Sequence, residues 1–456
     1  MFALLLALLV TVFVAYMIIK KYKPQPVLML GGLVLMALTI LLGSGDLLGE
    51  KSTGFVWFDL FEFIKNTFSH RAAGLGLIIM SVGGFARYMD HIGASKVLVK
   101  LAVKPLQKLR APYLVLALGY ILGQFLNIFI PSASGLGVLL MVTMFPILVN
   151  LGVSRLAATA LIGTTACLDL GPASGNSNLA ARHAGLDVAV YFAEYQIPAA
   201  IAVVITIAVL HYFVQKWLDQ RAGHVVTKKD MTEQSTTPGG EGDTPPAVYL
   251  ILPLIPLVLI LVFSKLLVSA IKMNVITAML IGIFISMIFE LIRKKDARAV
   301  LASIQVFFDG MGSQFAKVIT LIVAGETFAM GLKSIGAIDA IINLAQGSGF
   351  GVALMTIVMT GIIAVTAVIM GSGNAPFFSF AALAPDVTAK MGVPAVSMLL
   401  PMQFASGIAR TVSPITAVII AVSGIAGVST VDVVKRTAIP MAGALIATVL
   451  VNFILF

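Results

Sequence analysis

The sequence predicts an all-α polytopic membrane protein built as an inverted repeat, with about ten transmembrane helices and two re-entrant hairpins. Three observations support this fold class. Of the 456 residues, 59% are hydrophobic and only 11% are charged, whereas ordinary soluble domains carry about 25% charged residues. Apolar runs of transmembrane length recur along the chain, and the second half repeats motifs of the first. The 41 glycines and 19 prolines, many for so apolar a chain, indicate broken helices.

Runs of about 20 apolar residues mark the predicted transmembrane helices. They lie at 1–19, 25–43, 72–90, 156–180, 190–213, 248–264, 274–292, 313–331, 393–421 and 437–456. Regions 112–150 and 352–388 are also apolar, but each is too long for one span. Each carries a polar, Gly-rich break in its middle and is therefore predicted to form a hairpin. Amphipathic arms are predicted at 55–69 and 299–311.

The placement of Lys and Arg predicts the orientation in the membrane. With the N-terminus outside, about 21 basic residues fall inside and about 8 outside, which agrees with the positive-inside rule. The C-terminus is then also outside. The polar segment 216–246 becomes a cytoplasmic linker between a first repeat, 1–215, and a second, 247–456. The net charge of +10 follows from this topology and does not indicate a nucleic-acid partner.

The two halves match each other at an offset of about 240 residues. Phe85-Ala86 matches Phe328-Ala329, and the hairpin motifs IPSASGLG and MGSGNAPF occupy corresponding positions. In the predicted topology the matched spans 72–90 and 313–331 run in opposite directions across the bilayer. The repeat is therefore predicted to be inverted, with the two hairpins entering from opposite sides.

Four breaks in the apolar segments carry the predicted site. They are the hairpin tips Pro131–Gly137 and Gly371–Pro376, the stretch Gly171–Asn178, and Ser406-Gly407 together with Arg410–Pro414. Non-helical backbone at membrane depth is tolerated only inside protein or beside a water-filled cavity. Glycines such as Gly135 and Gly373 let backbone approach a ligand, half-helix N-termini attract anions, and freed carbonyls bind Na⁺. The alternative explanation is that small residues only let helices pack closely. That alternative is favoured for a single break, but four breaks at equivalent places favour a binding site.

Three ionisable residues fall at membrane depth, where a charge is costly and functional by default. Arg410 can hold a carboxylate through two parallel hydrogen bonds, or it can pair with a buried acid. Asp169 and Glu326 are candidates for coupling to a proton or cation, and equally for structural ion pairs. The further candidates for the coupling site are Ser174, Asn178 and Ser406.

The sequence argues against several other functions. The sequence contains no GxxxxGK[ST] phosphate loop, which a primary pump would need, and no cluster of His, Cys, Asp and Glu that would suggest a metalloenzyme. An intramembrane hydrolase that used Ser132 or Ser134 as its nucleophile would need a histidine base at membrane depth, and the sequence places its histidines near helix ends and boundaries. Arg87 and Asp90 lie near a helix end and are predicted to be solvated. The predicted function is secondary transport of an anion with no cofactor beyond a coupling Na⁺ or H⁺; an anion channel is the alternative from another class.

Five stretches carry a resemblance to a known family. They are AGLGLIIMSVGGFARYMDHIGAS, PSASGLGVLLMVTMFPILVNLGVSRLAA, FFDGMGSQFAKVITLIVAGETFAMGL, VIMGSGNAPFFSFAALAP and ARTVSPITAVIIAVSGIAGVS. They resemble the anaerobic C4-dicarboxylate uptake family of the DcuC type. An acid at both position 169 and position 326, here Asp169 and Glu326, resembles the DcuD-like branch of that family. The resemblance implies a carrier for succinate, fumarate, malate or aspartate in the bacterial inner membrane, with both termini periplasmic. A carrier for another small carboxylate stays open.

The resemblance extends to the wider ion-transporter superfamily. It implies a homodimer in which a transport domain moves against a scaffold by an elevator mechanism. The substrate contacts that this resemblance implies are Ser132, Ser134, Ser372 and Asn374 at the hairpin tips and Asn176, Thr411 and Ser413 in the broken spans, with Na⁺ possible at the tips. The tips read Ser-Ala-Ser-Gly and Gly-Ser-Gly-Asn, where the superfamily has a Ser-Asn-Thr signature.

Overall fold

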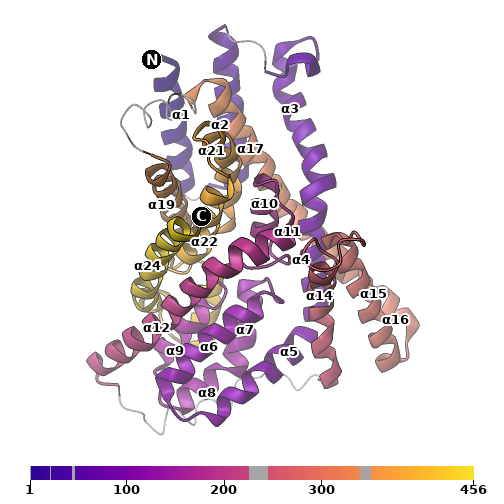
Figure 1. Ribbon diagram of the computed structural model, residues 1–456, viewed down its shortest axis with the longest axis vertical. Helices are drawn as coiled ribbons and strands as arrows, with labels where there is room; N and C mark the ends of the chain where they lie inside the picture. The colour runs from indigo at the N-terminus through magenta and orange to yellow at the C-terminus, as the bar shows by residue number, and fades with distance from the viewer. Residues whose placement is uncertain (1, 21, 44–46, 225–244, 338–339, 341–350) are drawn as a thin grey trace.

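The computed structural model describes residues 2–20, 22–43, 47–224, 245–337, 340 and 351–456. Within these residues the chain is helical and contains no strand (Figure 1). Seven of its helices are long and apolar enough to cross a membrane: Pro24–Leu41, Val56–His91, Val188–Arg221, Val275–Lys294, Ala297–Ser334, Val352–Met370 and Thr430–Leu455. The all-α class is confirmed, while the count of about ten spans, which includes shorter apolar helices, stays a prediction.

The described helices fall into two runs, one on each side of residues 225–244. The first half contains α1 (Phe2–Ile19), α2 (Pro24–Leu41), α3 (Val56–Arg71), α4 (Leu77–His91), α5 (Ala94–Val103), α6 (Pro112–Asn127), α7 (Ala133–Thr143), α8 (Phe145–Asn150), α9 (Arg155–Thr164), α10 (Gly175–His183), α11 (Val188–Val190) and α12 (Ile197–Arg221). The second half contains a 3₁₀ helix (Ala247–Leu254), α14 (Ile255–Val262), α15 (Val275–Lys294), α16 (Ala297–Gln314), α17 (Thr320–Ser334), α19 (Val352–Met370), α20 (Asn374–Phe380), α21 (Ala384–Lys390), α22 (Val396–Arg410), α23 (Ala417–Ala426) and α24 (Thr430–Leu455).

The two predicted amphipathic arms are not separate helices, contrary to the sequence prediction. Helix α3 continues through a π-helical turn, Ala72–Gly76, into α4, and α16 continues through a second π-helical turn, Phe315–Ile319, into α17. Neither junction contains a proline, so nothing removes a backbone donor and the helical hydrogen bonding continues with one widened turn. Each half therefore contains one long helix that is amphipathic at its start and apolar further on.

The structure moves two predicted boundaries within the broken spans. The first break runs from 165 to 174 and so begins before Gly171, because the hydroxyls of Thr164 and Thr165 bond to carbonyls three residues earlier and compete with the helix. In the second span, Ser406 and Gly407 lie inside α22, and only residues 411–416 are non-helical. The hairpin connections are 128–132 between α6 and α7 and 371–373 between α19 and α20.

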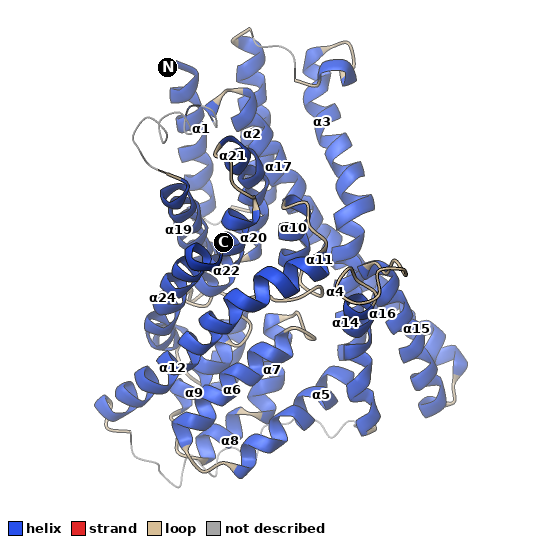
Figure 2. Ribbon diagram, viewed as in Figure 1, coloured by secondary structure: helices blue, strands red, loops and turns tan. Residues whose placement is uncertain are grey.

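Equivalent helices of the two halves lie at different ends of the molecule. Figure 2 shows α6, α7 and α8 in the lower part of the view, with α20 and α21 in the upper part. Helix α4 packs along α16, where a Cβ on Gly310 would lie only 2.7 Å from the Cα of Gly84. Small residues let helix backbones approach this closely. The inverted repeat and the re-entrant placement of the hairpins stay predictions.

The first part of the predicted linker is helical. Helix α12 extends to Arg221, and residues 225–244 lie outside the described part of the chain. Asp219 is buried and accepts hydrogen bonds from Ser154 Oγ at 2.6 Å and Tyr113 Oη at 2.9 Å, and it forms an ion pair with Arg436. A buried carboxylate is tolerated when it is paired and hydrogen-bonded in this way. These contacts extend α12 beyond residue 215 and join it to α6, α9 and α24.

Gly407→Ala is expected to destabilise the protein. A Cβ at this position would overlap the carbonyl oxygen of Cys167 in the break between α9 and α10. Because this contact is with backbone, relief is difficult and overpacking should cost about 3 kcal/mol. The measurement is the apparent Tm in detergent, with Gly424→Ala as the control, since a Cβ on Gly424 meets nothing within 4 Å. Equal Tm values for the two variants would contradict the close approach.

Candidate functional site

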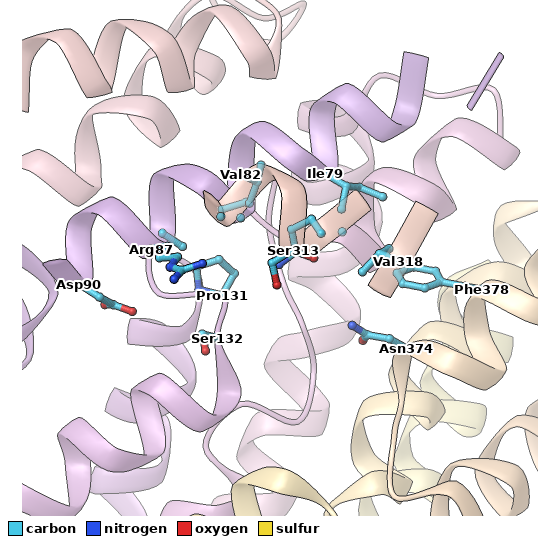
Figure 3. Close-up of a pocket in the computed structure, with 16 residues that line it drawn as sticks. Ile79, Val82, Arg87, Asp90, Pro131, Ser132, Ser313, Val318, Asn374 and Phe378 are labelled. Atoms are coloured by element: carbon cyan, nitrogen blue, oxygen red, sulfur yellow. The ribbon is translucent and has the colours of Figure 1, made fainter. Parts of the chain in front are cut away.

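A cavity of about 320 Å³ lies between the α4–α16 pair and parts of three other segments. These are the loop before α7, the end of the break before α10, and the first turn of α20. Figure 3 shows α4 supplying Arg87 and Asp90, the loop supplying Pro131 and Ser132, and α20 supplying Asn374. The cavity therefore lies where both hairpin connections and the first broken span meet.

Arg87 and Asp90 are exposed near the end of α4, as the sequence predicts, and they also line this cavity. They lie three residues apart on α4 and share one face of it. The structure records no ion pair between them, and among the described residues Arg87 has no hydrogen-bond acceptor. The cavity thus contains an exposed guanidinium with no partner carboxylate.

Two of the predicted hairpin-tip residues, Ser132 and Asn374, line the cavity. Ser132 precedes α7, and its Oγ accepts a hydrogen bond from the backbone N–H of Gly135 at 3.1 Å, as N-cap serines do. Ser134 and Gly135 follow in the first turn of α7 and do not line the cavity.

The second tip makes equivalent local contacts. The Oγ of Ser372 accepts a hydrogen bond from Ala375 N at 3.4 Å. Gly373 lets this tip approach α22 closely, because a Cβ there would lie 2.5 Å from the carbonyl oxygen of Ser406. The connection between α19 and α20 is therefore held directly against the helix that carries Arg410.

Arg410 and Asp169 form a buried ion pair beside the cavity. Arg410 Nη2 donates to Asp169 Oδ1 at 3.1 Å and to the carbonyl oxygen of Ala166 at 2.6 Å. Asn176 Nδ2 donates to Asp169 Oδ2 at 2.9 Å and to Asn374 Oδ1 at 3.2 Å. Asp169 has a φ of 48°, a left-handed conformation that Asp adopts more readily than most residues. The network joins both broken spans to the second hairpin tip.

A second polar network beneath this ion pair was not predicted from the sequence. Gln403 Nε2 donates to the carbonyl oxygen of Asp169 at 3.0 Å, and Ser177 Oγ donates to the same oxygen at 2.9 Å. Gln403 Oε1 accepts from Tyr191 Oη at 2.6 Å and from Gln196 Nε2 at 3.1 Å. All four side chains are fully buried. Their amide and hydroxyl types are common in apolar helices, so no sequence signal distinguished them from packing residues.

The remaining predicted site residues are buried, and none lines the cavity. Ser174 Oγ caps α10 by accepting from Ser177 N, and Asn178 donates to the carbonyl of Pro172 at 2.8 Å. Ser406 donates to the carbonyl of Gln403, and Thr411 to that of Ile408, both at 2.7 Å. Ser413 Oγ is buried with no hydrogen-bond partner among the described residues. The roles of these residues stay predictions.

Glu326 lies away from the cavity and pairs with Arg71. The Nε of Arg71 is 2.7 Å from Glu326 Oε1 and 2.9 Å from Oε2. This ion pair joins the end of α3 to the middle of α17. Both acids that the sequence placed at membrane depth are therefore each held by an arginine.

Comparisons with known proteins agree on one family. The sequence model of the DcuC family, described as C4-dicarboxylate anaerobic carriers, matches residues 2–456. The chain is similar to the probable anaerobic C4-dicarboxylate transporter DcuC of Vibrio cholerae, at 37% identity over 457 residues, covering 100% of this chain and 98% of that protein. It is also similar to the anaerobic C4-dicarboxylate transporter DcuC of Escherichia coli K12, at 36% identity over 447 residues, covering 98% and 95%.

Two solved structures have a similar fold. The YdaH transporter of Alcanivorax borkumensis superimposes with a TM-score of 0.59 at 16% identity, covering 95% of this chain and 98% of that chain. MtrF of Neisseria gonorrhoeae superimposes with a TM-score of 0.62 at 16% identity, covering 95% of each chain. At this identity the likeness supports the overall helical arrangement.

Proposed function

The chain belongs to the DcuC family of C4-dicarboxylate carriers, a family of transporters and not of enzymes, and on this premise we propose that it is a secondary active transporter of succinate, fumarate, malate or aspartate. Family membership and the apolar helices make it a multi-pass protein of the inner membrane with a small-molecule substrate. The proposal extends to the substrate, the site and the mechanism.

The observation that carries the proposal is the guanidinium of Arg87, which forms no ion pair with any described residue and lies in a cavity of about 320 Å³. Ligand pockets for small molecules start at about 300 Å³, so the volume suits a four-carbon diacid. A dianion that leaves water needs a compensating cation and hydrogen-bond donors. Arg87 supplies the cation and can bind a carboxylate with two parallel hydrogen bonds.

Polar groups on the facing wall complete the proposed site. The Ser132 hydroxyl and the Asn374 amide both reach the cavity and can donate to carboxylate oxygens. The second carboxylate would lie near the beginning of α7, an 11-residue helix whose positive dipole end favours an anion. Asp90, on α4 beside Arg87, disfavours a second bound anion, and it would complement an ammonium group, so aspartate belongs among the tested substrates.

The ion-pair network supports a moving unit. Hydrogen bonds from Asn176 to Asp169 and Asn374 and from Arg410 to Asp169 connect α10, α20, α22 and the first break. These segments would move together, while the α4–α16 pair, held by close backbone contact at Gly84 and Gly310, would form part of a static scaffold. This division is what an elevator mechanism requires. We further propose a homodimer, with both termini periplasmic and segment 216–246 cytoplasmic.

The coupling ion is proposed to be Na⁺ or H⁺, with dicarboxylate exchange as the uncoupled mode. Asp169 and Glu326 each form an ion pair with an arginine. Because the arginine compensates its charge, neither carboxylate is well suited to bind a coupling cation by itself. The Oδ1 of Asn176 is buried with no donor among the described residues, so it is available to a cation or a proton donor. Freed carbonyls of residues 165–174 can supply further oxygen ligands.

The direct test is uptake of labelled succinate by the purified protein in proteoliposomes. Inward Na⁺, inward H⁺ and internal unlabelled succinate are imposed separately, and protein-free liposomes serve as the control. Saturable uptake that one of these drives, and that fumarate, malate or aspartate inhibits, is the expected result. Non-saturating flux with single-channel currents would favour the channel alternative. Absence of succinate flux under all three conditions would overturn the proposal.

A further inference from the structure

The cavity wall formed by α4 and α16 has an equivalent in the other half of the chain, formed by α17 and α3. The match of Phe85-Ala86 with Phe328-Ala329 defines the correspondence between α4 and α17. Each of these helices has 15 residues and follows a π-helical turn. The same spacing places Glu326 opposite Gly83 and Arg71 opposite Gln314.

The side-chain contacts repeat as well. Gly83 and Gln314 both line the cavity, and a Cβ on Gly83 would overlap the Gln314 side chain. In the other half the corresponding residues, Glu326 and Arg71, also contact each other, as an ion pair at 2.7 Å. The contact between Gly83 and Gln314 at the cavity therefore has a charged counterpart in the other half, the contact between Glu326 and Arg71.

This second wall is covered in the structure. Helix α20 packs directly on α17, where a Cβ on Gly325 would lie 2.6 Å from the Cα of Ser379 near the end of α20. By the same spacing Gly325 corresponds to Val82, which lines the open cavity. One wall thus faces a cavity while its counterpart is closed by a half-helix of the proposed moving unit.

We infer that Arg71 and Glu326 form a second dicarboxylate-binding wall, which opens toward the opposite side of the membrane when the moving unit shifts. The inference rests on the proposed function. In the closed state the Glu326 carboxylate bonds to the Arg71 guanidinium as a substrate carboxylate would. Arg182 adds a second cation nearby, since its Nη2 lies 3.5 Å from the Cβ position of Gly74. Two guanidiniums against one carboxylate leave this face positive, which suits a dianion.

The two walls differ in a way that gives them different affinities. The residue that corresponds to Arg87 is Met330, so the second wall lacks that cation. Its own cation, Arg71, is occupied by Glu326, whereas Arg87 has no partner among the described residues. Substrate must therefore displace Glu326 to bind at the second wall. The positive-inside assignment places Arg87 inside and Arg71 outside, so the weaker binding is expected at the outer face.

The first experiment measures the KM for labelled succinate separately from each face, in right-side-out and inverted membrane vesicles. Arg71→Gln should raise the outer KM about tenfold or more and leave the inner KM unchanged. Glu326→Gln, which keeps the side-chain volume, should lower the outer KM. Arg71→Lys should give an outer KM between those of the wild type and Arg71→Gln. Lys333→Gln, an exposed charge on the same helix, is the matched control. Equal effects on both faces, or none, would overturn the inference.

The second experiment does not depend on dicarboxylate flux. Cys167 is the single cysteine, so Cys167→Ala provides a background for single-cysteine labelling. Ala86→Cys and its counterpart Ala329→Cys are treated with a membrane-impermeant maleimide in each vesicle type. Labelling of the first from the inside and of the second from the outside is expected. If Ala329→Cys is never labelled from the outside, no second wall opens there, even where the wild type transports succinate. If succinate flux is absent but Ala86→Cys and Ala329→Cys are labelled from opposite sides, the proposed substrate is wrong, while the opening of the second wall is supported.

Discussion

Arg87→Ala is expected to abolish high-affinity dicarboxylate transport while leaving the protein folded. Arg87 is exposed in the cavity and makes no ion pair with the described residues, so its removal leaves no buried charge unpaired. Loss of hydrogen bonds to a charged carboxylate should cost about 1.5 to 3 kcal/mol, or roughly 10- to 100-fold in KM. The measurement is the KM for succinate in proteoliposomes, together with the apparent Tm of the same preparation.

Two further variants sharpen this result. Arg87→Lys keeps the charge but not the planar donor pair, so an intermediate KM is expected. Lys100→Ala, at an exposed position on the neighbouring helix α5, removes a cation outside the cavity and should leave the KM unchanged. If Arg87→Ala transports succinate with the wild-type KM, the substrate does not bind at this guanidinium and the proposed site is wrong.

Breaking the Asp169–Arg410 ion pair from one side is expected to reduce stability more than any other change described. Only 8% of Asp169 and 9% of Arg410 are exposed, and removal of one partner leaves a buried charge without compensation. Such single changes cost about 3 to 5 kcal/mol. Asp169→Asn is the suitable variant for the acid, because Asn also tolerates the left-handed φ of 48°. Arg410→Gln is its partner.

The double variant separates a structural role from substrate contact. Asp169→Asn with Arg410→Gln removes both charges, so its apparent Tm should recover much of the loss seen in each single variant. If Arg410 acts only through Asp169, transport should recover in parallel. If Arg410 also contacts a substrate carboxylate, the double variant should be stable with a raised KM. Wild-type Tm values for both single variants would contradict the buried pair.

Much of the fold was predictable because the apolar runs and their breaks depend on composition alone. Helix α6 begins at Pro112 and α19 at Val352, where the predicted hairpins begin. The continuous helices through Ala72–Gly76 and Phe315–Ile319 were not predictable, because an amphipathic segment followed by an apolar one also fits two separate helices. The end of α12 depends on Asp219 meeting Arg436, a contact between distant parts of the chain.

The candidate site was only partly predictable. Ser132 and Asn374 lie in Gly-rich tips, a pattern that indicates backbone exposed at membrane depth, and both line the cavity. Arg87 and Asp90 gave no such signal, since a charged residue near a helix end usually faces water. Their role depends on α16 and the loop before α7 closing around them. The signal that could have found Arg87 is its position directly after the repeated Phe-Ala pair.

The sequence by itself determined that this is a helical membrane protein, since a chain with 11% charged residues and long apolar runs has no soluble alternative. Its motifs also identified the dicarboxylate family. Only the tertiary structure decided which charges are available to a substrate. Asp169 and Glu326 meet Arg410 and Arg71 across more than 200 residues of chain, whereas Arg87 forms no ion pair within the part of the chain that the structure describes. Ion pairs form through distance in space, which the order of residues along the chain does not specify.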